Sequence, residues 1–152
     1  MPLNLGQRLG QAAQKDAPAT NELSSAVLSI RGHYDFSIDG GAVGNISLTE
    51  NEAIPDGAVV VGGFINVTET VTGGAGSTLA ISVESAGDVL TAEAVASFSA
   101  GLYNVLPAPT SGDLTAGDGI LTTAARDIVL AVGTDPLTNG TFDIVLFVIP
   151  PA

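Results

Sequence analysis

The stretch Thr141-Phe142-Asp143-Ile144-Val145-Leu146-Phe147-Val148-Ile149, near the end of the chain, decides the fold. Successive side chains of a strand point to opposite faces. Two apolar sets therefore arise: Ile144, Leu146 and Val148 on one face, and Val145, Phe147 and Ile149 on the other. Such a strand is either central in the core, or it turns its outer face to a neighbouring subunit. We keep both interpretations and take Val145, Phe147 and Ile149 as candidate oligomer-interface residues.

Strand-like patterns recur upstream of this stretch. Apolar and polar residues alternate from Tyr34 to Asp39, and the alternation stops at Gly40-Gly41. The segment Ile54-Pro55-Asp56-Gly57 is typical of a turn, because Pro presets the backbone and Gly accepts a positive φ. Ala58 to Val71 then predicts a long strand, with a bulge or corner at Gly62-Gly63.

The connections are predicted from glycine-rich turns. Gly73 to Gly76 is expected to close a hairpin between the end of that long strand and a strand over Thr78 to Glu84. Asn139-Gly140 predicts a turn ahead of the final strand. Pro107 to Gly119, rich in Pro, Gly, Ser and Asp, is expected to be a long exposed loop.

One short helix is expected in the body, over Asp88 to Ala96 with Asp88 as its N-cap. Several short strands, frequent Gly-rich turns and almost no helix favour an all-β fold. We therefore predict an antiparallel β-sandwich or jelly roll with an extended N-terminal arm and at most one short helix.

Residues 1–25 differ in composition from residues 26–152, which form the predicted β-sandwich domain. Leu5, Leu9 and Ala13 recur at helical spacing, but Gly6 and Gly10 each weaken a helix by roughly 1 kcal/mol relative to Ala. The segment is either a flexible leader or an arm that becomes ordered against a partner. For the second case, Leu5, Arg8, Leu9 and Lys15 are the candidate contact residues.

Composition narrows the classes of protein. The 152 residues are 45% hydrophobic and only 13% charged, which favours a folded domain that hides apolar surface against partners. The net charge is -12, and three of the four basic residues lie in the first 31 positions. An acidic body repels phosphate backbones, so we expect no nucleic-acid binding. No apolar run is long enough for a membrane helix or a signal peptide, which predicts a cytosolic protein without membrane contact.

The residues that could carry chemistry are few. The one histidine, His33, has no accompanying nucleophile motif, and the chain has no cysteine. Asp35 with Asp39, or Asp113 with Asp118, could supply oxygen ligands to calcium, but neither pair has the spacing of a calcium loop. Gly73 to Gly76 lacks the Gly-Lys-Ser/Thr of a phosphate-binding loop. We expect a non-enzymatic protein with no catalytic residue, cofactor or metal.

Several segments together carry a family resemblance: Tyr34 to Gly44, Ile54 to Gly63, Leu121 to Ile128 and Asn139 to Ile144. From His33 to Ile149 the chain resembles small virion structural proteins of tailed bacteriophages, of the head decoration or cement kind. The resemblance implies a protein made in the host cytoplasm that binds the outside of the capsid. Its partner would be the major capsid protein, and its usual state a homotrimer that clamps neighbouring capsid subunits.

Two alternatives remain. One is a receptor-binding or glycan-binding jelly-roll module, with loop 107–119 as its site. Only two tyrosines and no tryptophan are present, which disfavours sugar binding. The other is a shell-forming capsid subunit, which would assemble into particles without a second protein.

Overall fold

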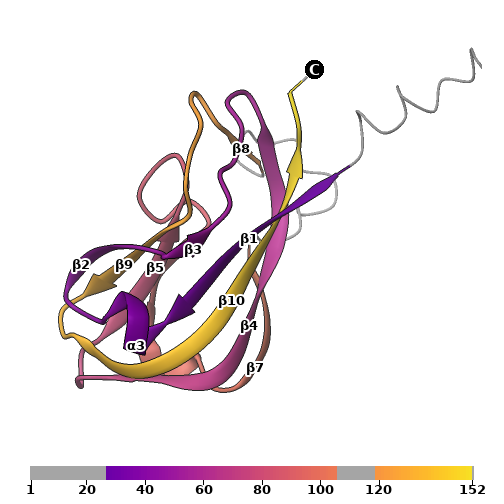
Figure 1. Ribbon diagram of the computed structural model, residues 1–152. Helices are drawn as coiled ribbons and strands as arrows, with labels where there is room; N and C mark the ends of the chain where they lie inside the picture. The colour runs from indigo at the N-terminus through magenta and orange to yellow at the C-terminus, as the bar shows by residue number, and fades with distance from the viewer. Residues whose placement is uncertain (1–26, 106–118, 152) are drawn as a thin grey trace, which may run out of the picture.

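The computed structural model describes residues 27–105 and 119–151, which form ten strands. The strands are β1 (Leu28–Asp35), β2 (Gly44–Ser47), β3 (Glu50–Asn51), β4 (Val59–Gly73), β5 (Thr78–Ser82), β6 (Leu90–Ala94), β7 (Gly101–Val105), β8 (Ile120–Leu121), β9 (Val129–Gly133) and β10 (Leu137–Ile149). The larger sheet has the order β3-β1-β10-β4-β7 with β8 paired to β4, and the smaller has the order β2-β9-β5-β6. All pairs are antiparallel, which confirms the predicted β-sandwich (Figure 1).

Strand β10 is the central strand of the larger sheet. It pairs with β1 from Thr141 to Val148 and with β4 along almost its whole length. Four alternate side chains are completely buried between the sheets: Phe142, Ile144, Leu146 and Val148. The period-2 pattern of the sequence therefore assigns the core face correctly.

The core lies between the two sheets. Phe142 packs against the rings of Tyr34 and Phe98, with ring centroids 4.9 and 6.4 Å apart. The smaller sheet contributes fully buried side chains from β5 and β9, namely Leu79, Ile81 and Leu130. Each such side chain contributes about 1.5–3 kcal/mol relative to an exposed one.

The turn at Pro55-Asp56-Gly57 and the irregularity near Gly62-Gly63 are confirmed. Ala58 N–H donates to the Pro55 carbonyl, and Gly57 has a φ of 73°. The β10–β4 register shifts between the pairs Phe147–Gly62 and Val148–Val60, which leaves Val61 as the extra residue. This bulge turns Val61 outward, where its side chain is exposed.

The predicted hairpin at Gly73 to Gly76 is wrong. Strand β4 belongs to the larger sheet and β5 to the smaller one, so this loop carries the chain from one sheet to the other. It lies against a second crossover, between β9 and β10, because Gly74 N–H donates to the Pro136 carbonyl and Gly76 N–H to the Asp135 carboxylate. The sequence shows turn residues, but the partner of each strand depends on residues far along the chain.

The turn predicted at Asn139-Gly140 is also wrong. Both residues lie inside β10, and the chain turns earlier, at Thr134, which has a φ of 67°. Gly140 has a φ of 139° at an irregular part of the β4 pairing, and a Cβ there would lie 2.9 Å from Val71 Cα. The glycine is needed for this close approach of two strands, not for a turn.

Two local secondary-structure predictions are wrong, one of a helix and one of a strand. The expected helix at Asp88 to Ala96 is strand β6 followed by a single 3-10 turn, η1 (Val95–Ser97). The alternation from Tyr34 to Asp39 ends as a strand at Asp35 and continues as a one-turn helix, α3 (Phe36–Asp39). Asp35 caps this turn by accepting a hydrogen bond from Ser37 N–H at 2.8 Å.

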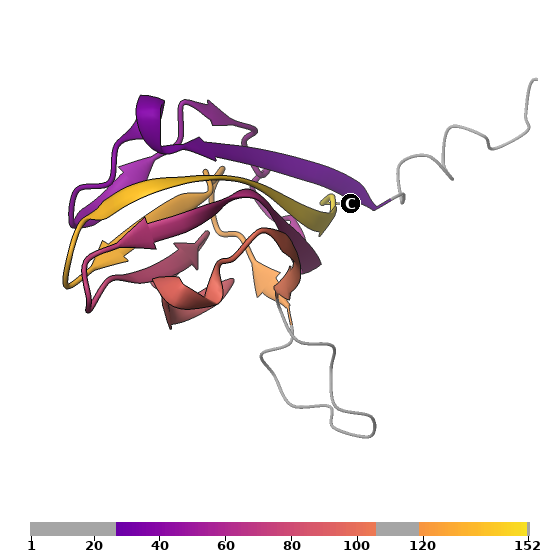
Figure 2. The ribbon, with the colours of Figure 1, turned by 90° about the horizontal axis from the view of Figure 1, so that it is seen from below.

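Both ends of the described chain lie at the same end of the molecule. Strand β1 begins beside the residues where β10 ends, since Leu28 pairs with Val148. The start of β1 and the end of β10 are neighbours in both views (Figures 1 and 2). The arm predicted over residues 1–25 and most of the loop predicted at 107–119 lie outside the described residues.

Candidate interaction surface

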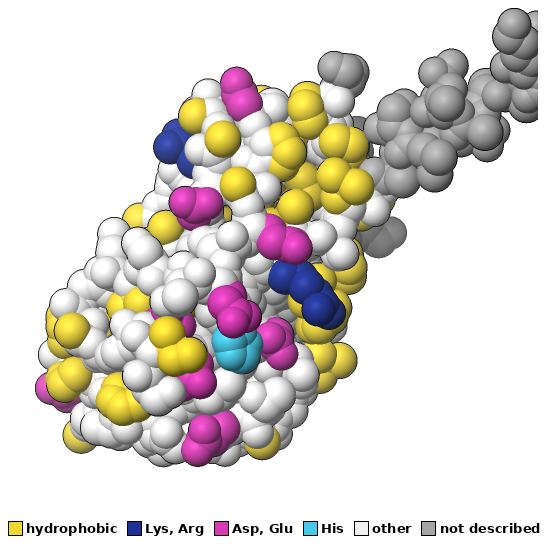
Figure 3. All heavy atoms as spheres, viewed as in Figure 1, with side chains coloured by type: hydrophobic (Ala, Val, Ile, Leu, Met, Phe, Trp, Pro, Cys, Tyr) yellow, Lys and Arg dark blue, Asp and Glu magenta, His cyan; other side chains and the backbone are white. Residues whose placement is uncertain are grey.

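The outer face of the larger sheet is apolar at the end where β1 begins and β10 ends. We define the apolar patch as five side chains that are 39–58% exposed: Val27, Val61, Leu121, Phe147 and Ile149. Strand pairing holds them together, because Val59 pairs with both Leu121 and Ile149. Figure 3 shows hydrophobic side chains gathered over this end of the molecule. A contiguous exposed apolar surface of this kind is typical of an interaction site.

The three candidate interface residues of β10 divide into two groups. Phe147 and Ile149 are 39% and 42% exposed and belong to the apolar patch. The Phe147 ring covers Gly62 and packs near the Phe64 ring, with centroids 6.0 Å apart. Val145 lies on the same face but is 4% exposed, flanked by its pairing partners Arg31 and Phe64. Among the described residues of this strand face, Phe147 and Ile149 are therefore exposed enough to contact a partner.

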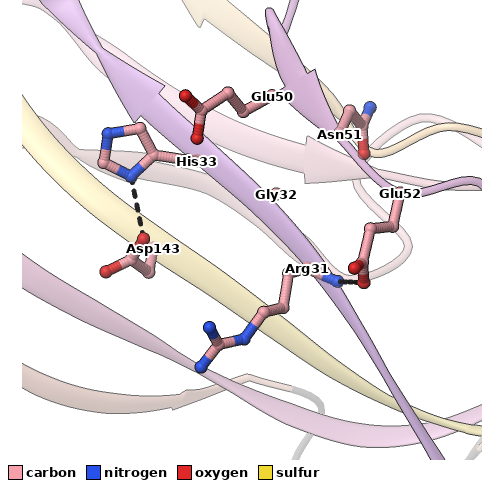
Figure 4. A pocket seen from close by; sticks show the side chains of 7 residues that line it. All are labelled: Arg31, Gly32, His33, Glu50, Asn51, Glu52 and Asp143. Atoms are coloured by element: carbon pink, nitrogen blue, oxygen red, sulfur yellow. Dashed lines mark hydrogen bonds and ion pairs between the residues drawn. The ribbon is translucent and has the colours of Figure 1, made fainter.

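The same face becomes charged beyond Val145. A surface pocket there is lined by Arg31, Gly32, His33, Glu50, Asn51, Glu52 and Asp143 (Figure 4). His33 Nδ1 lies 2.8 Å from Asp143 Oδ1, and Glu52 accepts a hydrogen bond from Arg31 N–H at 2.8 Å. We call this the acidic pocket, because its three carboxylates outnumber the one permanent cation, Arg31.

No local pattern of residues predicts the acidic pocket. His33 and Asp143 are 110 residues apart and meet only because β1 pairs with β10. Glu50 joins them because the two-residue strand β3 pairs with β1, placing it opposite His33. The Asn51 side chain anchors β3 to the segment before β9 by donating to the Ile128 carbonyl at 2.9 Å. Long-range pairing of this kind cannot be read from local pattern.

The pocket holds no arrangement for nucleophilic catalysis. Its described lining contains no serine, threonine or cysteine beside His33. His33 and Asp143 are also substantially exposed, at 32% and 45% of their side-chain surface. The His33–Asp143 contact is thus a half-exposed side-chain pair across β1 and β10.

The carboxylates considered as calcium ligands are used by the backbone. Asp35 accepts from the hydroxyl and then from the N–H of Ser37, which lowers the pKa of its carboxyl. Asp39 accepts from Asp35 N–H and from the N–H and hydroxyl of Thr49. Both groups therefore close the turn around α3. Asp113 and Asp118 lie outside the described residues, and no group of three metal-ligating side chains occurs among residues 27–105 and 119–151.

A second charged cluster locks the connection before β9 to the end of β5. Arg126 Nε and Nη2 donate to the two oxygens of Glu84 at 2.7 and 2.8 Å. Hydrogen bonds from Arg126, and then from Thr123, lower the pKa of Glu84 to about 2. The backbone of Arg126 is also bridged to Ile54 by two hydrogen bonds. This bidentate pair is a structural clamp within one chain.

The candidate arm contacts Leu5, Arg8, Leu9 and Lys15 lie outside the described residues, so their positions stay a prediction. In the part of the chain that the structure describes, no helix is long and apolar enough to cross a membrane.

Comparison with solved structures finds the same fold in chains of three bacteriophage capsids. The capsid of Ralstonia phage GP4 matches with a TM-score of 0.58 and 18% identity, over 84% of this chain and 86% of that one. The acidic stable capsid structure of Helicobacter pylori bacteriophage KHP30 matches at 0.54 and 16%, over 84% and 90%. The cyanophage Pam1 capsid asymmetric unit matches at 0.55 and 19%, over 82% and 85%.

At 16–19% identity these likenesses establish the shared fold. No protein-family model and no curated protein matches the sequence. The functional features of the described chain are thus the β-sandwich fold and the apolar patch on the outer face of its larger sheet.

Proposed function

We propose that this chain is a non-enzymatic structural protein of a bacteriophage virion, of the decoration or cement kind. The observation that carries the proposal is the fold, which chains of three phage capsids share over most of their length. The exposed apolar patch supports it, because a virion component is expected to keep part of its apolar surface for neighbours. In this role the protein binds the outer capsid surface, with the major capsid protein as its partner, and stabilises the shell.

Oligomerisation would make weak contacts effective. Each copy offers Phe147 and Ile149 on the apolar patch, and the arm residues Leu5, Arg8, Leu9 and Lys15 reach the capsid or an adjacent copy. In a homotrimer, three such sets bind the shell together, and linked contacts raise avidity far above that of one contact. Cyclic symmetry also closes the assembly, so that it remains small.

Co-sedimentation with empty capsids of the phage that encodes the protein tests the proposal. We expect the full-length protein to pellet with capsids, and a chain lacking residues 2–20 to remain in the supernatant while its body keeps a wild-type thermal unfolding profile. A matched pair refines the result, since Leu5→Asp with Leu9→Asp should abolish pelleting and Gln7→Asp with Gln11→Asp, which adds the same charge, should not. Capsid binding retained without residues 2–20 would reject the role of the arm.

A shell-forming capsid subunit is the second candidate, because the three matched structures are capsids. It differs in one measurable property, which is assembly into particles by the purified protein alone. The glycan-binding alternative depends on residues 107–119, almost all outside the described chain. A glycan array that gives a specific sugar signal would favour it over the cement role.

A further inference from the structure

The apolar patch lies at the point where the chain enters the body. Val27, the first described residue, is 55% exposed and belongs to the patch, and β1 follows directly. Ile149, at the end of β10, borders the same surface. Twenty-six residues precede Val27, so a long segment of chain starts from the edge of an exposed apolar surface.

The chemistry of that segment complements the surface. Residues 1–15 contain the apolar side chains Leu3, Leu5 and Leu9, and their only charged side chains are Arg8 and Lys15. The apolar patch is bordered along β1 and β10 by the acidic pocket. There Glu50, Glu52 and Asp143 face Arg31 and His33, which leaves an excess of negative charge for a basic segment. Leucines on the patch and cations at its acidic border would satisfy both surfaces.

The segment fits a neighbouring copy better than its own body. Residues 19–26, which lead into β1, contain neither Gly nor Pro, the strongest signals for a tight reversal of the chain. To reach the patch of its own chain the segment would have to reverse its direction here, whereas docking on a second copy requires no such reversal. Residues 16–26 can extend over at most about 40 Å, so the linker does not confine residues 3–15 to their own body.

We propose that, in the oligomer, residues 3–15 of one copy dock on the apolar patch of a second copy, with Leu5 and Leu9 on the patch and Arg8 and Lys15 toward the acidic pocket. This inference rests on the oligomeric cement role proposed above and names the contact that holds the oligomer together. It assigns the patch to an exchanged arm, and it explains why removal of the arm would also remove the avidity needed for capsid binding.

Cysteine pairing between full-length copies tests the contact, because the natural chain has no cysteine. A tagged Leu5→Cys chain is mixed with an untagged Leu121→Cys chain under mild oxidation. We expect the yield of mixed disulfide to be roughly tenfold higher than the yield with an untagged Ile38→Cys chain. Docked thiols react faster because their effective concentration is high. Ile38 is a matched control, 61% exposed against 58% for Leu121, and lies in α3 away from the patch (Figure 1).

Three results would overturn the proposal. Equal yields with Leu121→Cys and Ile38→Cys would show that the arm does not select the patch. An intramolecular disulfide in the double variant Leu5→Cys with Leu121→Cys, without mixed disulfide between copies, would place the arm on its own body. Preferential Leu121→Cys self-pairing would show that the bodies meet patch to patch. Co-sedimentation of the wild-type protein with capsids is scored separately, so failure of the arm contact and failure of the cement role remain distinguishable.

Discussion

At the residue scale, Gly140 combines a positive φ with close contact to the neighbouring strand β4. Its φ of 139° is strained for any residue with a Cβ, and that Cβ would also press on the backbone of Val71 in β4. We expect Gly140→Ala to lower the free energy of unfolding by about 2–6 kcal/mol, the sum of backbone strain and overpacking. Urea unfolding of the full-length protein measures it.

Gly44→Ala is the control, because Gly44 has a φ of 122° but nothing within 4 Å of the added Cβ. It should cost only the backbone strain, about 1–3 kcal/mol. Equal losses in the two variants would show that β4 moves away from Gly140 at little cost.

Glu84 gives the second prediction at this scale, a loss of stability in acid. Its pKa is about 2 in the folded chain, chiefly because Arg126 donates to it, against 4.5 for the free side chain. A lowered pKa stabilises the fold above pH 4.5, and this contribution is lost as the pH falls toward 2. We expect Glu84→Gln to lower the thermal midpoint at pH 7 and to flatten its decline between pH 4.5 and 2.

The exposed Glu93→Gln on β6 is the control for charge removal and should leave the pH profile as in the wild type. Because the pair is partly exposed, added salt should weaken the Glu84 effect. An unchanged acid limb in Glu84→Gln would contradict the prediction, because it would mean that the pKa of Glu84 is not lowered by folding.

At the element scale, the turn between β5 and β6 depends on one carboxylate. Asp88 accepts hydrogen bonds from the N–H groups of Val83, Glu84 and Ser85 at 2.8–2.9 Å. We expect Asp88→Ala to cost about 1–3 kcal/mol, since the freed N–H groups lose a charged acceptor. Denaturant titration checks this. Asp127→Ala, at an exposed position with the same charge change, should change stability by less than about 0.5 kcal/mol.

The same element shows where sequence reasoning succeeds and fails. The core face of β10 could be predicted because strand periodicity is local. The prediction of Asp88 as a helix N-cap is wrong, because Asp88 accepts from the N–H groups of residues that precede it, and the pairing of β6 with β5 replaces the helix. The supposed hairpin at Gly73 to Gly76 fails for a similar reason, because sheet membership is set by long-range pairing.

The candidate surface likewise contains residues that local periodicity predicts and residues that only long-range pairing brings together. Phe147 and Ile149 could be predicted as outward-facing from the period of one strand. Val61 and Leu121 could not, because a bulge turns the first outward and a two-residue strand places the second beside it. The acidic pocket needs three strands from both ends of the chain, and no local signal exists for it.

At the scale of the whole molecule, the number of binding surfaces separates a cement protein from a shell-forming subunit. A closed shell requires each subunit to make several different contacts, whereas one head-to-tail contact between an arm and a patch forms a ring when its rotation closes. The described face has one apolar patch beside an acidic region, and the chain carries a net charge of -12, which opposes crowding of copies. We therefore expect the purified protein to form a single small oligomer, with a trimer mass by light scattering that does not grow with concentration, and no particles by electron microscopy. Particles formed by the protein alone would instead establish the shell-forming role, while a clean monomer would leave assembly to the capsid surface and remove the pre-formed trimer.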